Sequence, residues 1–361
     1  MTQYNGWHFF NPVKVHYGRG KLSEIASLCG EAQRLLLVTS PGFLKRGVVD
    51  RVQALLKGKK VEVLSDVEEN PSLKYIEKVY PLAEGKDRII GLGGGSVMDT
   101  AKCLSVRYAD FSQMRDQIVD KKEISYRRIP FISIPTTSGT GSEVTPWATV
   151  WDKELKRKHS LALKDLWSCD ALVDPELTRT MPRDLTVATG LDVLSHALET
   201  FWNRNHNPVS STLAAQAVKL CLEALVPLTR DKDNMDLRDS MARASLLAGL
   251  AFSNTQTALA HSISYFLTMH HNIPHGIACG FSLPRLVRAS ETKPEIRKEF
   301  ETYGGDITAL REKMEDVYKA LGISTRIEDY TDSVDKIRES LALSDRLANS
   351  LLTFEDIVWE T

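Results

Sequence analysis

The 361-residue sequence has no excess of charge, no long apolar run and no leader-like start. Its 46 basic and 47 acidic residues are mixed along the chain, so neither a nucleic-acid partner nor another polyanion is expected. No window approaches the about 18 uninterrupted apolar residues of a membrane span, and the N-terminus lacks a basic segment followed by an apolar run. We therefore expect no membrane association and a place in the cytoplasm.

Cysteine is also scarce. None of the five cysteines forms a C-x-x-C pair, so neither a disulfide framework nor a zinc knuckle is indicated. We expect reduced and mostly buried thiols at positions 29, 103, 169, 221 and 279.

The first 180 residues alternate short apolar runs with helical patterns, as in an α/β layer structure. Continuous runs rich in branched aliphatic residues favour a parallel sheet that is buried on both faces. Strands are predicted at 35–38, 61–64, 88–92 and 131–134, a hairpin at 147–151 with 159–163 through a turn at 152–156, and helices at 45–57, 72–84 and 96–108.

From about residue 181 the strand-like runs disappear and an apolar spacing of 3.6 residues takes over. Helices are predicted at 187–202, 210–228, 236–256 and 307–321, and the last forty residues are interpreted as charged, peripheral helices. The predicted fold is an α/β N-terminal domain (1–180) with a parallel, dinucleotide-binding sheet, followed by an all-α C-terminal domain (181–361) that binds metal and substrate.

The most informative stretch is the predicted helix that carries Asp192 and His196. Residues four apart lie one turn above each other on a helix, so this carboxylate and imidazole can face one ion. The apolar residues Leu191, Leu194 and Leu198 would bury the helix and bring the polar pair into the interior. An isolated pair of this kind is more often a plain hydrogen-bonded pair.

Two later histidines change that interpretation. His261 lies in a second apolar stretch, and His275 stands between Pro274 and Gly276, where a turn can aim an imidazole inward. One Asp and three His form a mixed oxygen and nitrogen set that suits Fe²⁺, Zn²⁺, Mn²⁺ or Ni²⁺, and no cysteine belongs to this predicted set. Glu199 could orient one of the ligands, or could equally form a salt bridge.

A glycine-rich turn, Gly93-Gly94-Gly95-Ser96, joins a predicted strand to a predicted helix. Such a turn can hold a pyrophosphate at a helix N-terminus, although it matches neither G-x-G-x-x-G nor a P-loop and could be a plain tight turn. A second loop, 135–143, contains seven Thr, Ser or Gly residues in nine and follows the next strand. Together the loops favour a dinucleotide site over a solvated polar turn.

These motifs together resemble the iron-containing (group III) alcohol dehydrogenase family over most of the chain. The matching segments are GGGS-x-x-D-x-A-K (93–102), P-T-T-x-G-T-G-S-E (135–143), D-P-x-L-T (174–178), G-x-D-x-x-x-H-A-x-E (190–199) and P-H-G (274–276).

The resemblance implies an NAD(P)-dependent enzyme with a divalent metal, Fe²⁺ first and Zn²⁺ or Mn²⁺ as alternatives, and a homodimer or larger homo-oligomer. The implied metal ligands are Asp192, His196, His261 and His275. The implied cofactor contacts are Gly94, Gly95, Ser96, Asp99, Thr136, Thr137, Thr140, Lys158 and Leu177.

The sequence departs from the family pattern at two places. Tyr265 stands where many members have a second histidine. Tyr265, His270 or His271 could therefore take the place of that histidine in a proton relay. Ser40 stands where NAD-preferring members have an Asp after the first strand, and without that carboxylate both NAD and NADP stay open.

The chemistry implied by the resemblance is reversible hydride transfer between the nicotinamide and an aldehyde or alcohol carbon, with the metal as Lewis acid. Arg204 and His206, in the segment 201–208, would suit an anionic head group. In this respect the chain resembles the branch of the family that reduces phosphonoacetaldehyde or sulfoacetaldehyde. Alternatively, this segment is a polar turn that ends a helix. Other readings are an uncharged short-chain alcohol dehydrogenase, a lyase similar to dehydroquinate synthase, a metal-dependent hydrolase and a noncatalytic scaffold.

Overall fold

The computed structural model describes residues 6–155, 157–342, 344 and 346–359. The chain forms two compact units. The α/β unit comprises residues 12–137 and 142–178, and the helical unit comprises residues 1–11, 138–141 and 179–361. The helical unit thus includes two short segments from the N-terminal half, and the predicted boundary at residue 180 stays a prediction.

The α/β unit is built on a six-stranded parallel sheet in the order β1-β10-β7-β4-β2-β3. The four strands predicted from apolar runs are confirmed. Two more strands were missed, because the edge strand β1 is partly exposed and β10 has only four residues. The strands are β1 (Lys14–Tyr17), β2 (Arg34–Thr39), β3 (Lys60–Leu64), β4 (Arg88–Gly93), β7 (Phe131–Pro135) and β10 (Asp170–Val173).

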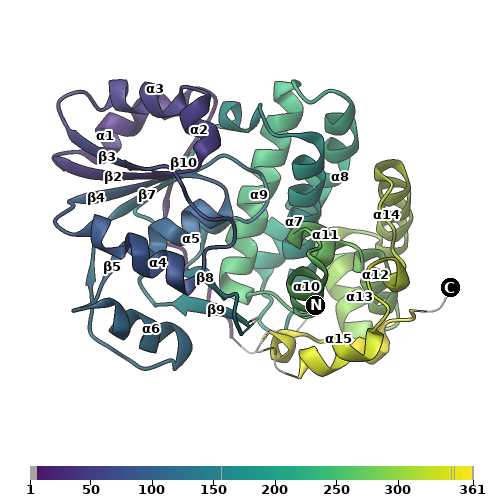
Figure 1. Cartoon of the computed structure of the whole chain (residues 1–361). Coiled ribbons are helices and arrows are strands. Elements are labelled where there is room, and N and C mark those ends of the chain that lie inside the picture. Colours follow the sequence, from purple (N-terminus) through teal and green to yellow (C-terminus); the bar gives the residue numbers. More distant parts are fainter. Residues whose placement is uncertain (1–5, 156, 343, 345, 360–361) are drawn as a thin grey trace. The chain divides into compact units, whose positions relative to one another are not determined.

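Helices cover both faces of this sheet (Figure 1). Leu35 and Leu37 of β2 pack in one apolar cluster, whereas Leu36 and Val38 pack in another, as the alternation of side chains along a strand requires. The first cluster includes residues of α1 (Ile25–Cys29), α2 (Pro41–Lys45) and α3 (Val48–Leu55). The second includes residues of α4 (Leu73–Val79), α5 (Gly95–Leu104) and α6 (Phe111–Val119).

Two predicted helices have different bounds from those expected. The stretch 45–57 is divided at Gly47. The left-handed φ of 71° at this glycine interrupts the helical backbone, so α2 ends before it and α3 begins after it. The stretch 96–108 ends at Leu104, because residues beyond it form the short strand β5 (Val106–Arg107), which pairs with β6 (Arg127–Arg128).

The predicted hairpin is confirmed. Strands β8 (Trp147–Asp152) and β9 (Arg157–Ala162) pair antiparallel in register from Trp147 opposite Ala162 to Asp152 opposite Arg157. Lys156, in the predicted turn, lies outside the described residues.

The helical unit contains the four long helices that the periodicity predicts: α7 (Arg183–Phe201), α8 (Pro208–Arg230), α9 (Met235–Thr255) and α14 (Ile307–Leu321). Shorter helices were missed because they offer too few turns for a clear period. They are α10 (Leu259–His271), α11 (His275–Gly280), α12 (Leu283–Glu291) and α13 (Pro294–Glu299).

The C-terminal segment is not peripheral, and that expectation was wrong. It holds α15 (Val334–Leu341), and Ile337, Leu352 and Phe354 are buried in the same apolar cluster as α7 and α8. Short 3-10 helices occupy Lys21–Glu24, Tyr80–Ala83, Ser142–Val144, Pro175–Thr178, Ile327–Asp329, Leu347–Asn349 and Phe354–Asp356. A short π-helix occupies Phe300–Gly304.

One helix in the described part of the chain, α8, is long and apolar enough to cross a membrane by length and composition alone. Half of the stretch that passes this test is buried inside the structure. A core helix passes the same test, so the feature is weak evidence for a membrane span.

Candidate active site

Helix α7 places the two predicted helical ligands in the interior of the helical unit. Leu191, Leu194 and Leu198 are fully buried, which confirms the apolar stripe. Asp192 and His196, one turn apart on this helix, are 3% and 5% exposed. The Nε2 atom of His196 lies 3.9 Å from the Oδ1 atom of Asp192.

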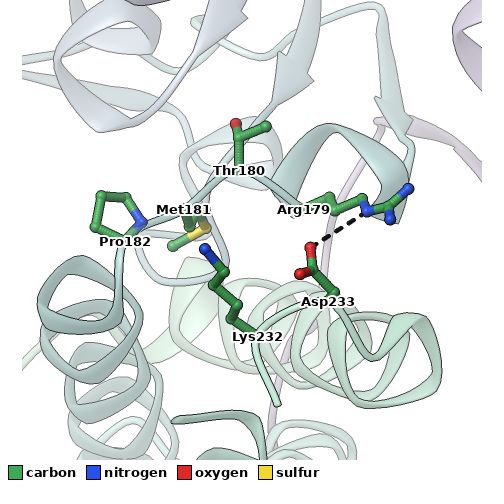
Figure 2. A pocket seen from close by; sticks show the side chains of 6 residues that line it. All are labelled: Arg179, Thr180, Met181, Pro182, Lys232 and Asp233. Carbon is green, nitrogen blue, oxygen red and sulfur yellow. Dashed lines mark hydrogen bonds and ion pairs between the residues drawn. The ribbon is translucent and has the colours of Figure 1, made fainter. Parts of the chain in front are cut away.

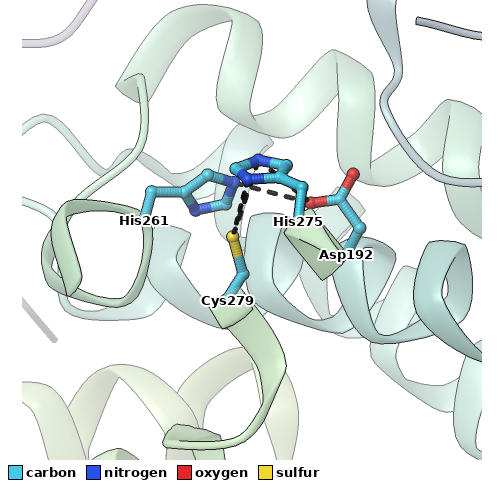
Figure 3. Close-up of side chains that lie close together, drawn as sticks. All are labelled: Asp192, His261, His275 and Cys279. Atoms are coloured by element: carbon cyan, nitrogen blue, oxygen red, sulfur yellow. Dashed lines mark hydrogen bonds and ion pairs between the residues drawn. The ribbon is translucent and has the colours of Figure 1, made fainter. Parts of the chain in front are cut away.

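Two further imidazoles reach the same carboxylate oxygen. His261 near the start of α10 and His275 at the start of α11 bring their Nε2 atoms to 3.6 Å and 4.0 Å from Asp192 Oδ1. Figure 3 shows both rings beside the Asp192 carboxylate. All four predicted ligands therefore converge, although more than eighty residues separate the first from the last.

The glycine after His275 is required by the packing of α11 against α7. A Cβ atom at Gly276 would lie 1.8 Å from the carbonyl oxygen of Ala188, which is backbone and cannot swing aside. The absence of a side chain thus permits the close approach that brings His275 to Asp192.

Several polar atoms at this point have no hydrogen-bond partner. Asp192 Oδ1 and His261 Nε2 are buried without one. Burying such atoms costs free energy of the order of 1 to 3 kcal/mol each unless something compensates them. A carboxylate oxygen and converging ring nitrogens, buried and unsatisfied, are the donors that a divalent cation would use.

Glu199 fixes the orientation of His261. Its carboxylate lies 2.6 Å from His261 Nδ1 and accepts hydrogen bonds from the backbone N–H groups of Ala258 and His261. A carboxylate accepts only, so Nδ1 carries a proton, and Nε2 is the ring nitrogen that faces Asp192. Of the two roles considered for Glu199, the structure favours that of a partner that orients a metal ligand.

The surroundings shift the pKa values of the ligands in different directions. Burial would lower the pKa of His261, but the nearby Cys279, Glu199 and Asp192 hold it well above its usual value. Burial would raise the pKa of Asp192, but the surrounding histidines, His196 first, hold it below its usual value. Burial lowers the pKa of His196 to about 4, despite the opposing effect of Asp192, so this ring is neutral at neutral pH. Neutral imidazole is the form that binds metals.

The thiol of Cys279 lies close to three of the four predicted ligands, and the expectation that no cysteine takes part stays a prediction. One ligand atom each from Asp192, His261, His275 and Cys279 lie within 4.8 Å of one another, a group that does not include His196. Figure 3 shows the Cys279 sulfur directed at the two rings. Its thiol was missed although His275 and Cys279 have the same four-residue spacing as Asp192 and His196.

Solvent reaches the cluster at His275. The side chain of His275 is 31% exposed, whereas those of Asp192 and His261 are 5% and 3% exposed. A small molecule would therefore approach the cluster from the side of His275.

The residues considered for a proton relay lie along α10. Tyr265 is half-buried one turn beyond His261, and His270 is exposed. His271 Nε2 lies 3.1 Å from the hydroxyl of Thr331. The structure thus gives His271 a partner outside the cluster, and the relay role of Tyr265 stays a prediction.

In the α/β unit, most of the predicted cofactor contacts follow the carboxyl ends of adjacent parallel strands, where open α/β sheets bind ligands. Ser40 follows β2, Gly94, Gly95 and Ser96 follow β4, Thr136 and Thr137 follow β7, and Leu177 follows β10. Thr140 belongs to the helical unit.

The glycine-rich turn leads into α5 as predicted. Gly94 is the residue before the helix, and no side chain caps its first turn, so these N–H groups can receive an anion. A Cβ atom at Gly94 would lie 3.2 Å from the Thr137 side chain, which shows how closely the two loops approach. Asn70 donates its backbone N–H to the Ser96 hydroxyl.

Asp99 and Lys158 complete the predicted cofactor set. Asp99 on α5 is half-buried, and burial raises its pKa although the nearby Lys102 and Lys158 oppose that shift. Lys158 lies on β9, with its Nζ 5.7 Å from the centre of the Trp151 ring. Both are therefore placed in the same unit as the glycine turn.

The anion site considered in the segment after α7 stays a prediction. His206 Nδ1 lies 3.0 Å from Glu299 Oε1, and Asn207 caps α8. Phe201 and Trp202 are buried in the core. Of the two cationic side chains considered for an anion, Arg204 is exposed and His206 is half-buried.

A separate open pocket of about 420 Å³ lies where the chain enters α7 (Figure 2). An ion pair between Arg179 and Asp233, 3.4 Å apart, borders it, and Lys232 lines it. The pocket shares no residue with the metal cluster.

The chain matches two family models that together span most of its length. Residues 12–175 match the model described as iron-containing alcohol dehydrogenase, and residues 186–358 match the C-terminal model of the Fe-containing alcohol dehydrogenase family. The NADPH-dependent butanol dehydrogenase of Clostridium saccharobutylicum is 32% identical over 338 residues, which cover 89% of this chain and 86% of that protein.

Longer relatives and a solved structure give similar matches. The aldehyde-alcohol dehydrogenase 2 of Entamoeba histolytica is 34% identical over 79% of this chain, but the match spans only 34% of that longer protein. The crystal structure of sulfoacetaldehyde reductase from Bifidobacterium kashiwanohense in complex with NAD+ is 29% identical, with a TM-score of 0.88 over 97% of this chain and 96% of that one.

Proposed function

Because the chain belongs to the iron-containing alcohol dehydrogenase family, we propose that it is a metal-dependent, NAD(P)H-linked reductase of a short aldehyde that also catalyses the reverse oxidation. The observation that carries this proposal is the buried cluster of Asp192 and three histidines with unsatisfied donor atoms. A hydrolase or a scaffold would not need both such a cluster and the proposed nucleotide-binding loops in one chain.

The donor set fits a divalent cation. When bound, the cation would act as a Lewis acid that stabilises negative charge on the substrate oxygen during hydride transfer. Asp192 would supply the only formal charge among the four proposed ligands, and His196, His261 and His275 would supply neutral nitrogens. Glu199 is a positioning residue, since it holds the His261 ring through Nδ1.

The proposed nucleotide site lies at the carboxyl ends of β4 and β7. The first turn of α5 and the loop at Thr136 and Thr137 offer backbone N–H groups and hydroxyls to a pyrophosphate. Ser40 carries no charge that would repel a 2′-phosphate, so we propose that both NADH and NADPH bind.

The proposed substrate is a short aldehyde. The solved relative named for sulfoacetaldehyde favours an anionic head group, whereas the relative named for butanol favours an uncharged chain. The segment 201–208 offers little support for an anion, because His206 is paired with Glu299. Tyr265 remains the proposed proton relay for the alcohol oxygen.

A matched panel tests the proposal. Oxidation of NADH and NADPH is followed with sulfoacetaldehyde, phosphonoacetaldehyde and butyraldehyde, using metal-free protein reloaded with Fe²⁺, Zn²⁺ or Mn²⁺. We expect turnover with at least one aldehyde only after reloading. Turnover near the reloaded level in metal-free protein would overturn the role of the cation.

We also infer a homodimer or larger assembly that works in the cytoplasm. The free cysteines of the described chain suit a reducing compartment, and the assembly follows from the family resemblance. Light scattering of the purified protein tests the assembly, and a monomer at micromolar concentration would contradict it.

A further inference from the structure

The turn between α9 and α10 contains a strained residue. Gln256 directly follows the last residue of α9 and has a φ of 65° and a ψ of −178°. Glycine adopts this combination of angles readily, whereas a residue with a Cβ atom adopts it only where its surroundings hold it. The same turn leads to the proposed ligand His261, five residues further on. A change in the backbone at Gln256 would therefore affect how His261 is presented.

Helix α7 and the residues directly after it hold this turn at two points. Glu199 accepts hydrogen bonds of 2.9 Å and 3.1 Å from the backbone N–H groups of Ala258 and His261. The side-chain amide of Asn203 donates a hydrogen bond of 3.1 Å to the carbonyl oxygen of Gln256. Asn203 comes four residues after Glu199, and both residues are fully buried. The two side chains thus fix the turn before and at the start of α10.

The C-terminal segment contacts the same turn. Arg346 donates a hydrogen bond to the side-chain oxygen of Gln256, and the Asn349 amide donates one of 3.1 Å to the carbonyl oxygen of Thr257. The carbonyls of Gln256 and Thr257 are therefore both held by asparagine side chains from distant parts of the chain. Strained backbone persists only where its surroundings over-determine it, and these contacts supply that restraint.

We propose that Asn203 is a positioning residue for the metal ligand His261. By holding the carbonyl of Gln256, its amide keeps the strained turn in place. This conformation of the turn keeps the N–H groups of Ala258 and His261 against Glu199. Without the amide, the backbone at Gln256 relaxes toward a negative φ and His261 moves away from Glu199. The inference rests on the proposed cation site and adds to it a residue that is not itself a ligand.

Relief of the strain tests this role. We expect Asn203→Ala to lower Zn²⁺ affinity about tenfold, as the loss of support behind a ligand commonly does. Adding Gln256→Gly should restore the affinity, because glycine adopts the observed backbone angles without help from the amide. Asn234→Ala is the matched control, since this asparagine caps the opposite end of α9. Its loss should lower the melting temperature and leave the Zn²⁺ affinity unchanged.

A proton signal gives a second readout that needs no cation. In metal-free wild-type protein, the hydrogen bond of 2.6 Å between His261 Nδ1 and the Glu199 carboxylate should give a proton resonance far downfield. This resonance should be lost or shifted in Asn203→Ala, return when Gln256→Gly is added, and stay unchanged in Asn234→Ala. A loss of stability alone would not produce this pattern.

Wild-type Zn²⁺ affinity in Asn203→Ala, or a double variant that binds Zn²⁺ as weakly as the single one, overturns the inference. If Asn203→Ala does not fold, Asn349→Ala with and without Gln256→Gly should show the same loss and recovery, because Asn349 is half-buried and holds the next carbonyl. Unchanged affinity in Asn349→Ala would then overturn it. A wild-type protein that binds no Zn²⁺ overturns the proposed function, and the proton resonance still decides the role of Asn203.

Discussion

The two units bury charged side chains in different ways. In the α/β unit the ammonium of Lys102 is fully buried and donates hydrogen bonds to the hydroxyls of Ser142 and Thr145 and to the carbonyl of Trp147. In the helical unit Asp192 Oδ1 and His261 Nε2 are as deeply buried and have no such partner. An ammonium has three N–H groups, so Lys102 is satisfied by the protein alone.

This contrast distinguishes a structural polar cluster from one that requires a ligand. The three bonds of Lys102 hold α5 against the loop and strand that follow β7, and nothing further is needed there. In the proposed function, a cation compensates the buried polar atoms of the Asp192 cluster. Changes in the two clusters should therefore affect different properties.

The largest effect is expected for His261→Ala. This change removes the ligand that Glu199 orients, so we expect divalent-cation affinity to fall by more than about 100-fold and turnover to be lost. Nucleotide binding, measured by NADH fluorescence, should persist because most of the proposed cofactor contacts, although not Thr140, lie in the α/β unit. The control is His8→Ala, which removes an exposed imidazole. Unchanged cation affinity in His261→Ala would contradict the proposal that the Asp192 cluster binds a cation whereas the Lys102 cluster needs none.

Removal of the cation should destabilise the helical unit alone. At a cation concentration about 100 times the dissociation constant, binding stabilises the folded state by about 2.7 kcal/mol. Amides of α7, α10 and α11 should therefore exchange hydrogen up to about 100-fold faster after chelation, while those of β2, β4 and β7 stay unchanged. Equal acceleration in both units would contradict the account.

Glu199→Gln should weaken the site without emptying it. The amide can still contact His261 Nδ1 but no longer carries the charge that favours the required tautomer, so cation affinity should fall about 10- to 100-fold. Glu199→Asp should recover part of the loss. A titration with Zn²⁺ measures both, and a change in melting temperature without a change in affinity would make Glu199 merely structural.

A further effect concerns the pH dependence of stability at Lys102. Burial lowers the pKa of Lys102 to about 8, below the 10.5 of an exposed lysine. Between these values the unfolded chain holds a proton that the folded chain has lost, so the contribution of Lys102 to stability rises with pH, by at most about 3 kcal/mol. Below pH 8 both states are charged and the full cost of burial remains.

The variant Lys102→Met tests whether the contribution of Lys102 to stability rises with pH. In urea titrations the wild type should gain stability between pH 8 and 10.5, and the variant should lack this rise. The cation affinity of the variant should equal that of the wild type. A wild-type profile that stays parallel to that of the variant between pH 8 and 10.5 and falls only above pH 10.5 would show that the pKa of Lys102 is raised instead of lowered.

The helical pair of the site followed from sequence periodicity, because residues four apart must share a helix face. The meeting of His261 and His275 with that pair depends on how α10 and α11 pack, which no local pattern encodes, and here the family resemblance supplied the expectation. The same four-residue rule applied to His275 would have included Cys279. The buried core strands of the sheet were predictable from their apolar runs, whereas β1 was not, because its edge position leaves it partly exposed.

The most direct test of the central claim is an anomalous difference map from crystals of the Zn²⁺-loaded protein, recorded at the zinc absorption edge. The account predicts one strong peak within about 2.0 to 2.3 Å of Asp192 Oδ1 and His261 Nε2. A crystal that contains zinc but shows no peak there, or shows the peak beside other residues, would contradict it.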